Sequence, residues 1–168
     1  FTDKEIESLF KASKLMLDDE PKQNTSKIRI KIARMAKKGL KMVFIDYLGM
    51  IACDKKAWSK NHEIEMIVND LKNIALEFNI IVVLLCQLNR SLEGRSNHKP
   101  VLSDLRDSGS IEQTADIVMF VHREEYYLSK AKPWKREEIQ EWEQDMQQVA
   151  NKAQIIVAKN NFHGRTIS

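Results

Sequence analysis

Four short apolar runs, separated by helical segments, constrain the fold of this chain more than any other feature. The run NIIVVLLCQ (79–87) is continuous and rich in β-branched residues, which is typical of a strand covered on both faces. Similar runs stand at 42–46, 116–122 and 153–159. Over 62–79, apolar residues recur at i, i+3, i+4 and i+7, which predicts an amphipathic helix. Buried strands alternating with helices predict an α/β fold, a mostly parallel sheet flanked by helices.

The composition suits one globular domain. The chain has 168 residues, of which 43% are hydrophobic and 30% charged, so it is long enough to bury a core. Its longest clean apolar run (80–86) is far too short to span a membrane, and 1–20 is charged throughout, unlike a secretory signal. Cys53 and Cys86 offer neither a disulfide framework nor a metal-ligand spacing. We therefore expect a cytoplasmic protein with no membrane partner.

The net charge is only +3, but the basic residues are unevenly distributed. They crowd one predicted helix and the turn after it: Lys27, Arg29, Lys31, Arg34, Lys37, Lys38 and Lys41. Such a run is most often a solvated helix face. It could also face DNA or a neighbouring subunit, and the sequence leaves these alternatives open.

The polar residues that follow the predicted strands suggest a site. In parallel sheets, ligands gather beyond the carboxyl ends of the strands. The first polar groups after the four strands are Asp46, Gln87, His122 or Arg123, and Lys159. We expect them to lie along one edge of the sheet, where a nucleotide and its metal ion would bind.

Asp46 ends the strand in KMVFIDYLGMI (41–51). A carboxylate in that position fits the second nucleotide motif of P-loop enzymes, where the acid orients the magnesium shell. A strand-end Asp is also common as a turn or helix cap. Gln87, at the end of the next strand, could sense a γ-phosphate or an attacking water, or it could simply satisfy backbone groups in a turn.

One part of such a site is missing from the sequence. None of the five glycines belongs to a G-x-x-x-x-G-K-[ST] loop, so β- and γ-phosphates have no cradle of backbone N–H groups. The sequence is therefore expected to be either the carboxyl-terminal part of a larger protein or a module that no longer hydrolyses nucleotide.

CQLNRSLEGRSNHKPVLSDLRDSGSIEQTADIVMFVHREEYY (86–127) resembles the bacterial replicative hexameric DNA helicases of the DnaB type, which have a RecA-like motor domain. FIDYLGMI (44–51) resembles their second nucleotide motif, and 1–38 looks like the stretch just upstream of it. The similarity covers nearly the whole chain and begins after the family's P-loop and general-base glutamate. It implies that 1–168 is part of one RecA-like motor domain.

The resemblance also implies a function. It predicts ATP-dependent DNA unwinding by a homo-hexamer that moves 5′ to 3′ on single-stranded DNA at the replication fork. ATP and Mg²⁺ would be the cofactors, and primase and a helicase loader the partners. Asp46 would bind magnesium through water, and Gln87 would couple the γ-phosphate to the DNA loop. Arg106, Asp107 and Gly109 would grip single-strand phosphates, contacts that are blind to sequence.

The sequence departs from the family at the residues that act on the neighbouring subunit's nucleotide. The family carries K-x-R after its last strand, and this chain reads AKNNFHGRT (158–166). Lys159 matches the lysine, Asn161 replaces the arginine, and Arg165 stands further on, where it could substitute. A second hypothesis is therefore a non-hydrolysing RecA-like module that binds DNA or a helicase subunit. A third, a RecA-type recombinase, is disfavoured by the long match over 103–117.

Overall fold

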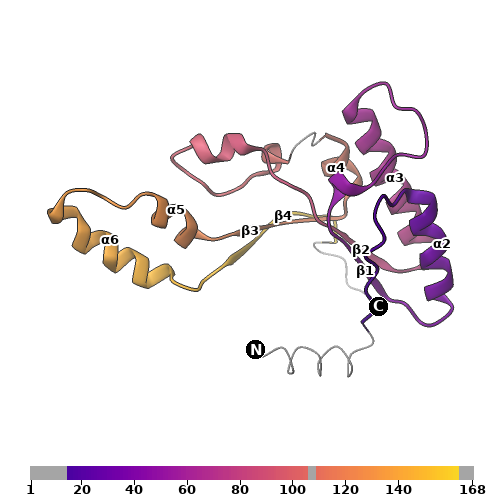
Figure 1. Ribbon diagram of the computed structural model, residues 1–168, viewed down its shortest axis with the longest axis horizontal. Coiled ribbons are helices and arrows are strands. Elements are labelled where there is room, and N and C mark those ends of the chain that lie inside the picture. Colours follow the sequence, from indigo (N-terminus) through magenta and orange to yellow (C-terminus); the bar gives the residue numbers. More distant parts are fainter. Residues whose placement is uncertain (1–14, 106–108, 163–168) are drawn as a thin grey trace.

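A computed structural model describes residues 15–105 and 109–162, and in these ranges helices and strands alternate as the apolar pattern predicts (Figure 1). The helices are α2 (Thr25–Ala36), α3 (Lys60–Phe78), α4 (Gly109–Thr114), α5 (Glu124–Lys130) and α6 (Arg136–Val149). The strands are β1 (Met42–Ile45), β2 (Ile81–Leu84), β3 (Ile117–His122) and β4 (Gln154–Asn160). Short 3₁₀ helices cover Leu48–Met50, Arg90–Gly94 and Leu102–Asp104.

The two long helices of the core begin at polar caps. The Asn24 side chain accepts a hydrogen bond from the Lys27 N–H at the start of α2, and Ser59 accepts one from the His62 N–H at the start of α3. α3 ends at Asn79, which adopts a left-handed conformation. The predicted apolar stripe of α3 is confirmed, since Ile64, Ile67, Val68, Leu71 and Ile74 are buried.

The strands form two ladders. β1 and β2 are parallel, with Met42 opposite Ile81 and Ile45 opposite Leu84. β3 and β4 are antiparallel, with a register shift between Val118 and Met119. The parallel pair confirms the predicted α/β class. The expectation that all four strand ends share one edge is wrong, because the chain turns back after β3 through α5 and α6 and β4 runs in the opposite direction.

One face of the strands packs against the helices, and the other is open. Along β3, Val118 and Phe120 are buried, whereas Val121 is 70% exposed. Val43 and Ile45 of β1 likewise pack against the core. The exposed apolar side chains of the strands are Met42, Phe44, Ile81, Ile117, Met119, Val121, Ile155 and Val157.

The interpretation of 79–87 and 116–122 as strands covered on both faces is therefore wrong for the described residues. Side chains alternate across a strand, so a continuous apolar run supplies two apolar faces. The helices described here cover only one of them.

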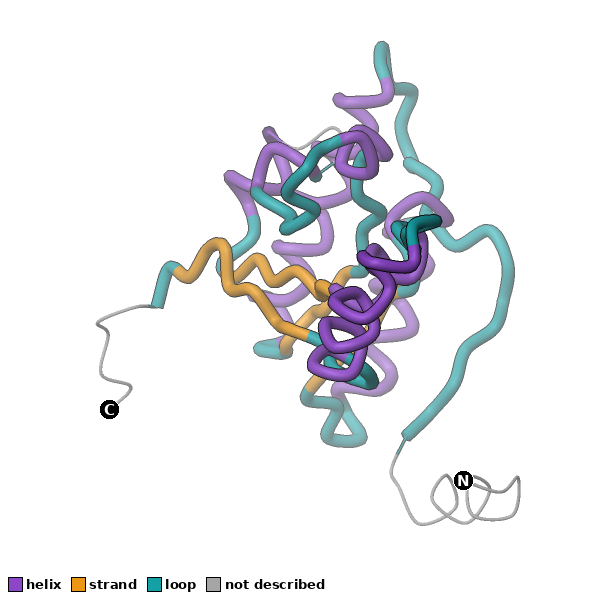
Figure 2. The backbone as a smooth tube through the Cα atoms, turned by 90° about the vertical axis from the view of Figure 1, so that its left-hand side faces the viewer, coloured by secondary structure: helices purple, strands orange, loops and turns teal. Residues whose placement is uncertain are grey.

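α5, α6 and their connections, residues 123–153, form an arm that extends from the far end of β3 and β4 (Figure 1). The rest of the described chain, here called the body, holds α2, β1, α3, β2 and α4. Figure 2 looks along the arm toward the body. Within residues 15–105 and 109–162, no helix is long and apolar enough to cross a membrane.

Candidate nucleotide site at the edge of the parallel strands

Asp46 lies where β1 leaves the core. Val43 and Ile45 hold the strand against the helices, and the next residue is exposed. Asp46 lines a groove of about 380 Å³ between residues 18–23 and the start of the first 3₁₀ helix. Its carboxylate has no hydrogen-bond or ion-pair partner among the described residues, so it remains hydrated and available to a cation.

Gln87 lies beyond the same edge. The Leu85 N–H donates to the Ile45 carbonyl at 3.0 Å, and the Leu48 N–H donates to the Leu85 carbonyl at 2.9 Å. These bonds continue the pairing of β1 and β2 past the last ladder residues. Asp46 and Gln87 therefore follow neighbouring parallel strands at one edge, and both are exposed.

The segment after Gln87 leads directly to the expected DNA loop. Leu88 forms an isolated antiparallel bridge with Leu105, the residue before Arg106. The Asn89 N–H donates to the Asp104 carbonyl at 2.8 Å. A short backbone connection thus joins the end of β2 to the start of that loop.

An ion pair between Arg95 and the buried carboxylate of Asp104 fixes this connection. Asp104 is 5% exposed, and its Oδ2 accepts from Arg95 Nη2 at 2.7 Å and from the Val101 N–H at 2.8 Å. A buried carboxylate with these partners is costly to displace. These contacts therefore hold the backbone just before residue 106 in place.

The structure tests the expected DNA residues only in part. Arg106 and Asp107 lie outside the described residues. Gly109 is the exposed first residue of α4, a helix that the buried Ile111 attaches to the core.

Lys159 lies near the start of β3, where it pairs with Val118 across the ladder. Its Nζ donates to the Glu112 carbonyl at 2.5 Å and to the Gln113 carbonyl at 3.4 Å, which satisfies the carboxyl end of α4. Asn161 is exposed, and its N–H donates to the Asp116 carbonyl at 2.9 Å. Arg165 lies outside the described residues.

His122 and Arg123 lie at the opposite end of β3 from Lys159, so the expectation that either shares an edge with it is wrong. His122 is 2% exposed, and its Nε2 is 2.8 Å from Glu124 Oε2. Arg123 pairs with Glu125, and the guanidinium hydrogen bond holds the pKa of Glu125 below its ordinary value. Both groups are therefore engaged in ion pairs at the base of the arm.

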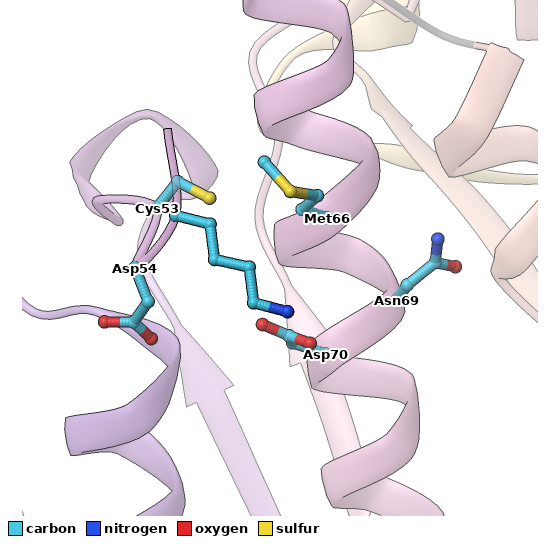
Figure 3. Close-up of a pocket in the computed structure, with 6 residues that line it drawn as sticks. Cys53, Asp54, Met66, Asn69 and Asp70 are labelled. Atoms are coloured by element: carbon cyan, nitrogen blue, oxygen red, sulfur yellow. The ribbon is translucent and has the colours of Figure 1, made fainter. Parts of the chain in front are cut away.

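A polar cluster around Thr25 could not be predicted from the sequence, because its residues lie far apart in the chain. Thr25 is buried, and its hydroxyl lies 2.9 Å from Asp54 Oδ2 and 2.7 Å from Asp70 Oδ2. Both carboxylates border a cavity of about 150 Å³ between the loop after β1 and α3 (Figure 3). Burial acts to raise the pKa of Asp54, but hydrogen bonds from Ser26 and Thr25 outweigh it and lower the pKa. The cluster connects α2, α3 and the loop that follows β1.

The single carboxylate of Asp46 is compatible with Mg²⁺ binding through water. Among residues 15–105 and 109–162, no group of three or more His, Cys, Asp or Glu side chains is placed to hold a metal ion. Mg²⁺, however, commonly keeps several waters and takes only one or two protein carboxylates. An unpaired, hydrated carboxylate such as Asp46 fits that mode of binding.

The fold and the site define a class: an α/β protein whose candidate site lies beyond the carboxyl ends of parallel strands. The family model for the DnaB-like helicase C-terminal domain matches residues 2–167. The chain belongs to this family, which confirms the resemblance found in the sequence.

Relatives in the same family are helicases. The chain is 45% identical over 150 residues to the "Replicative DNA helicase DnaB" of Rickettsia bellii. The aligned region covers 86% of this chain and 30% of that protein. It is 47% identical over 146 residues to the protein of the same name from Rickettsia prowazekii, with the same coverages. The chain thus spans about a third of the length of these relatives.

Two solved structures share the fold. One is described as a DnaB-like replicative helicase and its interactions with primase, and the other as an ATPase domain. Each aligns with a TM-score of 0.77 at 30% identity over 94% of this chain. The alignment covers 35% of the first structure's chain and 51% of the second's. The RecA-like fold expected from the resemblance is confirmed.

Proposed function

We propose that this chain is part of the motor domain of a replicative DNA helicase that hydrolyses ATP to move 5′ to 3′ on single-stranded DNA. The observation that carries the proposal is the shared position of Asp46 and Gln87 beyond adjacent parallel strands, in a chain of the DnaB-like family. The setting is the replication fork in the cytoplasm.

The residues have distinct roles in this proposal. Asp46 holds Mg²⁺ through water, and the ion neutralises charge that develops on the nucleotide phosphates. Gln87 responds to the γ-phosphate. Because Leu88 pairs with Leu105, a shift at Gln87 passes through one bridge to the chain at Arg106. Arg106, Asp107 and Gly109 then grip the phosphates of single-stranded DNA.

The open face of the strands supports a larger domain. Eight apolar side chains of the two ladders remain exposed, and exposed apolar strand faces of this kind commonly mark an interface. The relatives are about three times as long as the matched region. In our proposal, parts of the protein outside this sequence cover this face and supply the phosphate-binding loop.

Neighbouring subunits complete the nucleotide site. The proposed assembly is a homo-hexamer with nucleotide between subunits, and primase and a loader are its further partners. Lys159 and Arg165 are the proposed residues that reach across. To do so, Lys159 would first release the α4 carbonyls that it now binds. Assembly would therefore exchange a hydrogen bond within the chain for a contact with the neighbouring subunit's nucleotide.

The test is Asp46→Ala in the full-length protein. We expect DNA-stimulated ATP turnover to fall by on the order of 100-fold or more, with folding unchanged, because the exposed carboxylate has no partner to lose. Asp19→Ala is the matched control, since Asp19 is an exposed carboxylate bordering the same groove. Full activity in Asp46→Ala would overturn the proposal. A tailed DNA fork would test the direction of movement.

A non-hydrolysing module that binds DNA or a helicase subunit is the second candidate. Asn161 stands where the family carries its arginine, and it cannot replace that charge. Strong, salt-sensitive DNA binding by the full-length protein without any ATP turnover would favour this candidate.

A further inference from the structure

The arm carries an acidic surface that pairs with no basic side chain in the described part of the chain. On α6, Ile139, Trp142 and Met146 are half-buried, and Trp142 donates a hydrogen bond to the Leu128 carbonyl of α5. None of the described side chains of α6 is fully buried. On the side away from these residues lies the acidic stripe, which consists of Glu137, Glu141 and Asp145, one helical turn apart. All three are exposed and have no ion-pair partner among the described residues.

The body carries a complementary surface at the end of α2. The first half of the basic run is paired within the chain: Lys27 and Lys31 with Glu20, and Arg29 with Glu77. The second half, here called the cationic cluster, consists of Arg34, Lys37, Lys38 and Lys41. These four side chains are exposed, and none pairs with an acid in the described part of the chain.

The two surfaces cannot meet within one molecule. The arm extends from one end of the molecule, and α2 lies at the other end (Figure 1). A contact between them therefore needs two copies of the chain. A contact that joins opposite ends of successive copies is head-to-tail, and head-to-tail contacts generate closed rings when the rotation between copies closes.

We infer that the acidic stripe of one copy binds the cationic cluster of the next copy, so that the arm spans the boundary between neighbouring subunits. This inference rests on the proposed ring assembly and names the surface that forms part of it. Opposite charges at such a contact set the register of the copies and speed their association.

Charge exchange tests the contact in the full-length protein. Variant A carries Glu137→Lys, Glu141→Lys and Asp145→Lys, and variant B carries Lys37→Glu and Lys38→Glu. Each variant alone sets like charges against each other, so self-association measured by sedimentation velocity should weaken at least about 10-fold. A mixture of A with B, or both sets of changes in one chain, places opposite charges together again and should restore assembly. Raising the salt concentration should weaken the wild-type contact.

Lys55→Glu with Lys56→Glu is the matched control for variant B, because it reverses two exposed lysines outside the cluster and should leave assembly unchanged. Assembly that survives in both A and B would overturn the inference and leave the proposed helicase function standing. Loss of DNA binding in B with assembly intact would assign the cluster to DNA and also overturn it. A full-length protein that stays monomeric at every concentration would instead remove the ring from the proposed function.

Discussion

The body and the arm both contain a long amphipathic helix, but the two helices are held in different ways. α3 buries five aliphatic side chains among α2, α4 and the parallel strands. α6 packs against α5, and its apolar residues stay half-exposed. The same helical period therefore serves two purposes in this molecule. In the body it builds a core, and in the arm it presents a surface.

The energetic consequence is unequal stability. Burying an aliphatic side chain is worth about 1.5–3 kcal/mol, so most of the stabilisation in this chain lies in the body. No described side chain of α5 or α6 is fully buried, so the arm depends on individual contacts, among them the Trp142 Nε1–H bond to the Leu128 carbonyl at 2.8 Å and the Lys132 ammonium over the Trp142 ring. An element held this way opens at a lower free energy than the core.

The largest expected effect is a difference in unfolding free energy between matching substitutions in α3 and α6. Ile67 is 1% exposed in α3, and Ile67→Ala should lower the free energy of unfolding by about 3 kcal/mol through lost burial and a cavity. Ile139→Ala removes the same atoms from α6 and should cost less than about 1 kcal/mol, because the side chain is only half-buried. Denaturant titration of the full-length protein measures both. Equal losses would mean that the arm is as tightly packed as the body.

A smaller effect should be confined to the arm. Trp142→Phe keeps an aromatic ring but removes the hydrogen bond to Leu128, worth about 1 kcal/mol. Hydrogen exchange should accelerate at the amides of α5 and α6 and remain unchanged in α3. Trp58→Phe is the control, since Trp58 is exposed at the start of α3 and donates no hydrogen bond in the described chain. Faster exchange throughout the body would show that arm and body open together.

The same division explains what the sequence could predict. α3 was predictable because each apolar position repeats along one helix face, and Asp46 and Gln87 were predictable as neighbours because parallel strands share an edge. The direction of β4 was not, since an apolar run such as QIIVAK has the same pattern in either direction. α5 was not predicted at all, because seven residues are too few to show a helical period.

Contacts between residues far apart in the chain could not be predicted from the sequence either. Tyr127 of α5 stacks on His98 with ring centroids 4.1 Å apart and on His122 at 5.5 Å, which joins the base of the arm to the loop before Asp104. Thr25, Asp54 and Asp70 meet although they are far apart in the chain. Neither cluster has a local spacing that could reveal it. The roles of the site residues remain predictions, whereas their positions at the strand ends followed from the fold.

The smallest expected effect concerns a single thiol of the body. Cys86 follows β2 and packs against the core, and burial raises the pKa of its thiol to about 11. At pH 8 only about one molecule in a thousand then carries the reactive thiolate. Alkylation of the peptide containing Cys86, followed by mass spectrometry in the folded full-length protein, should therefore be slow and should accelerate up to about pH 11. A rate that already levels off near the ordinary thiol pKa of about 8.5 would mean that the body opens around Cys86 as readily as the arm does, and the contrast between the two regions would fail.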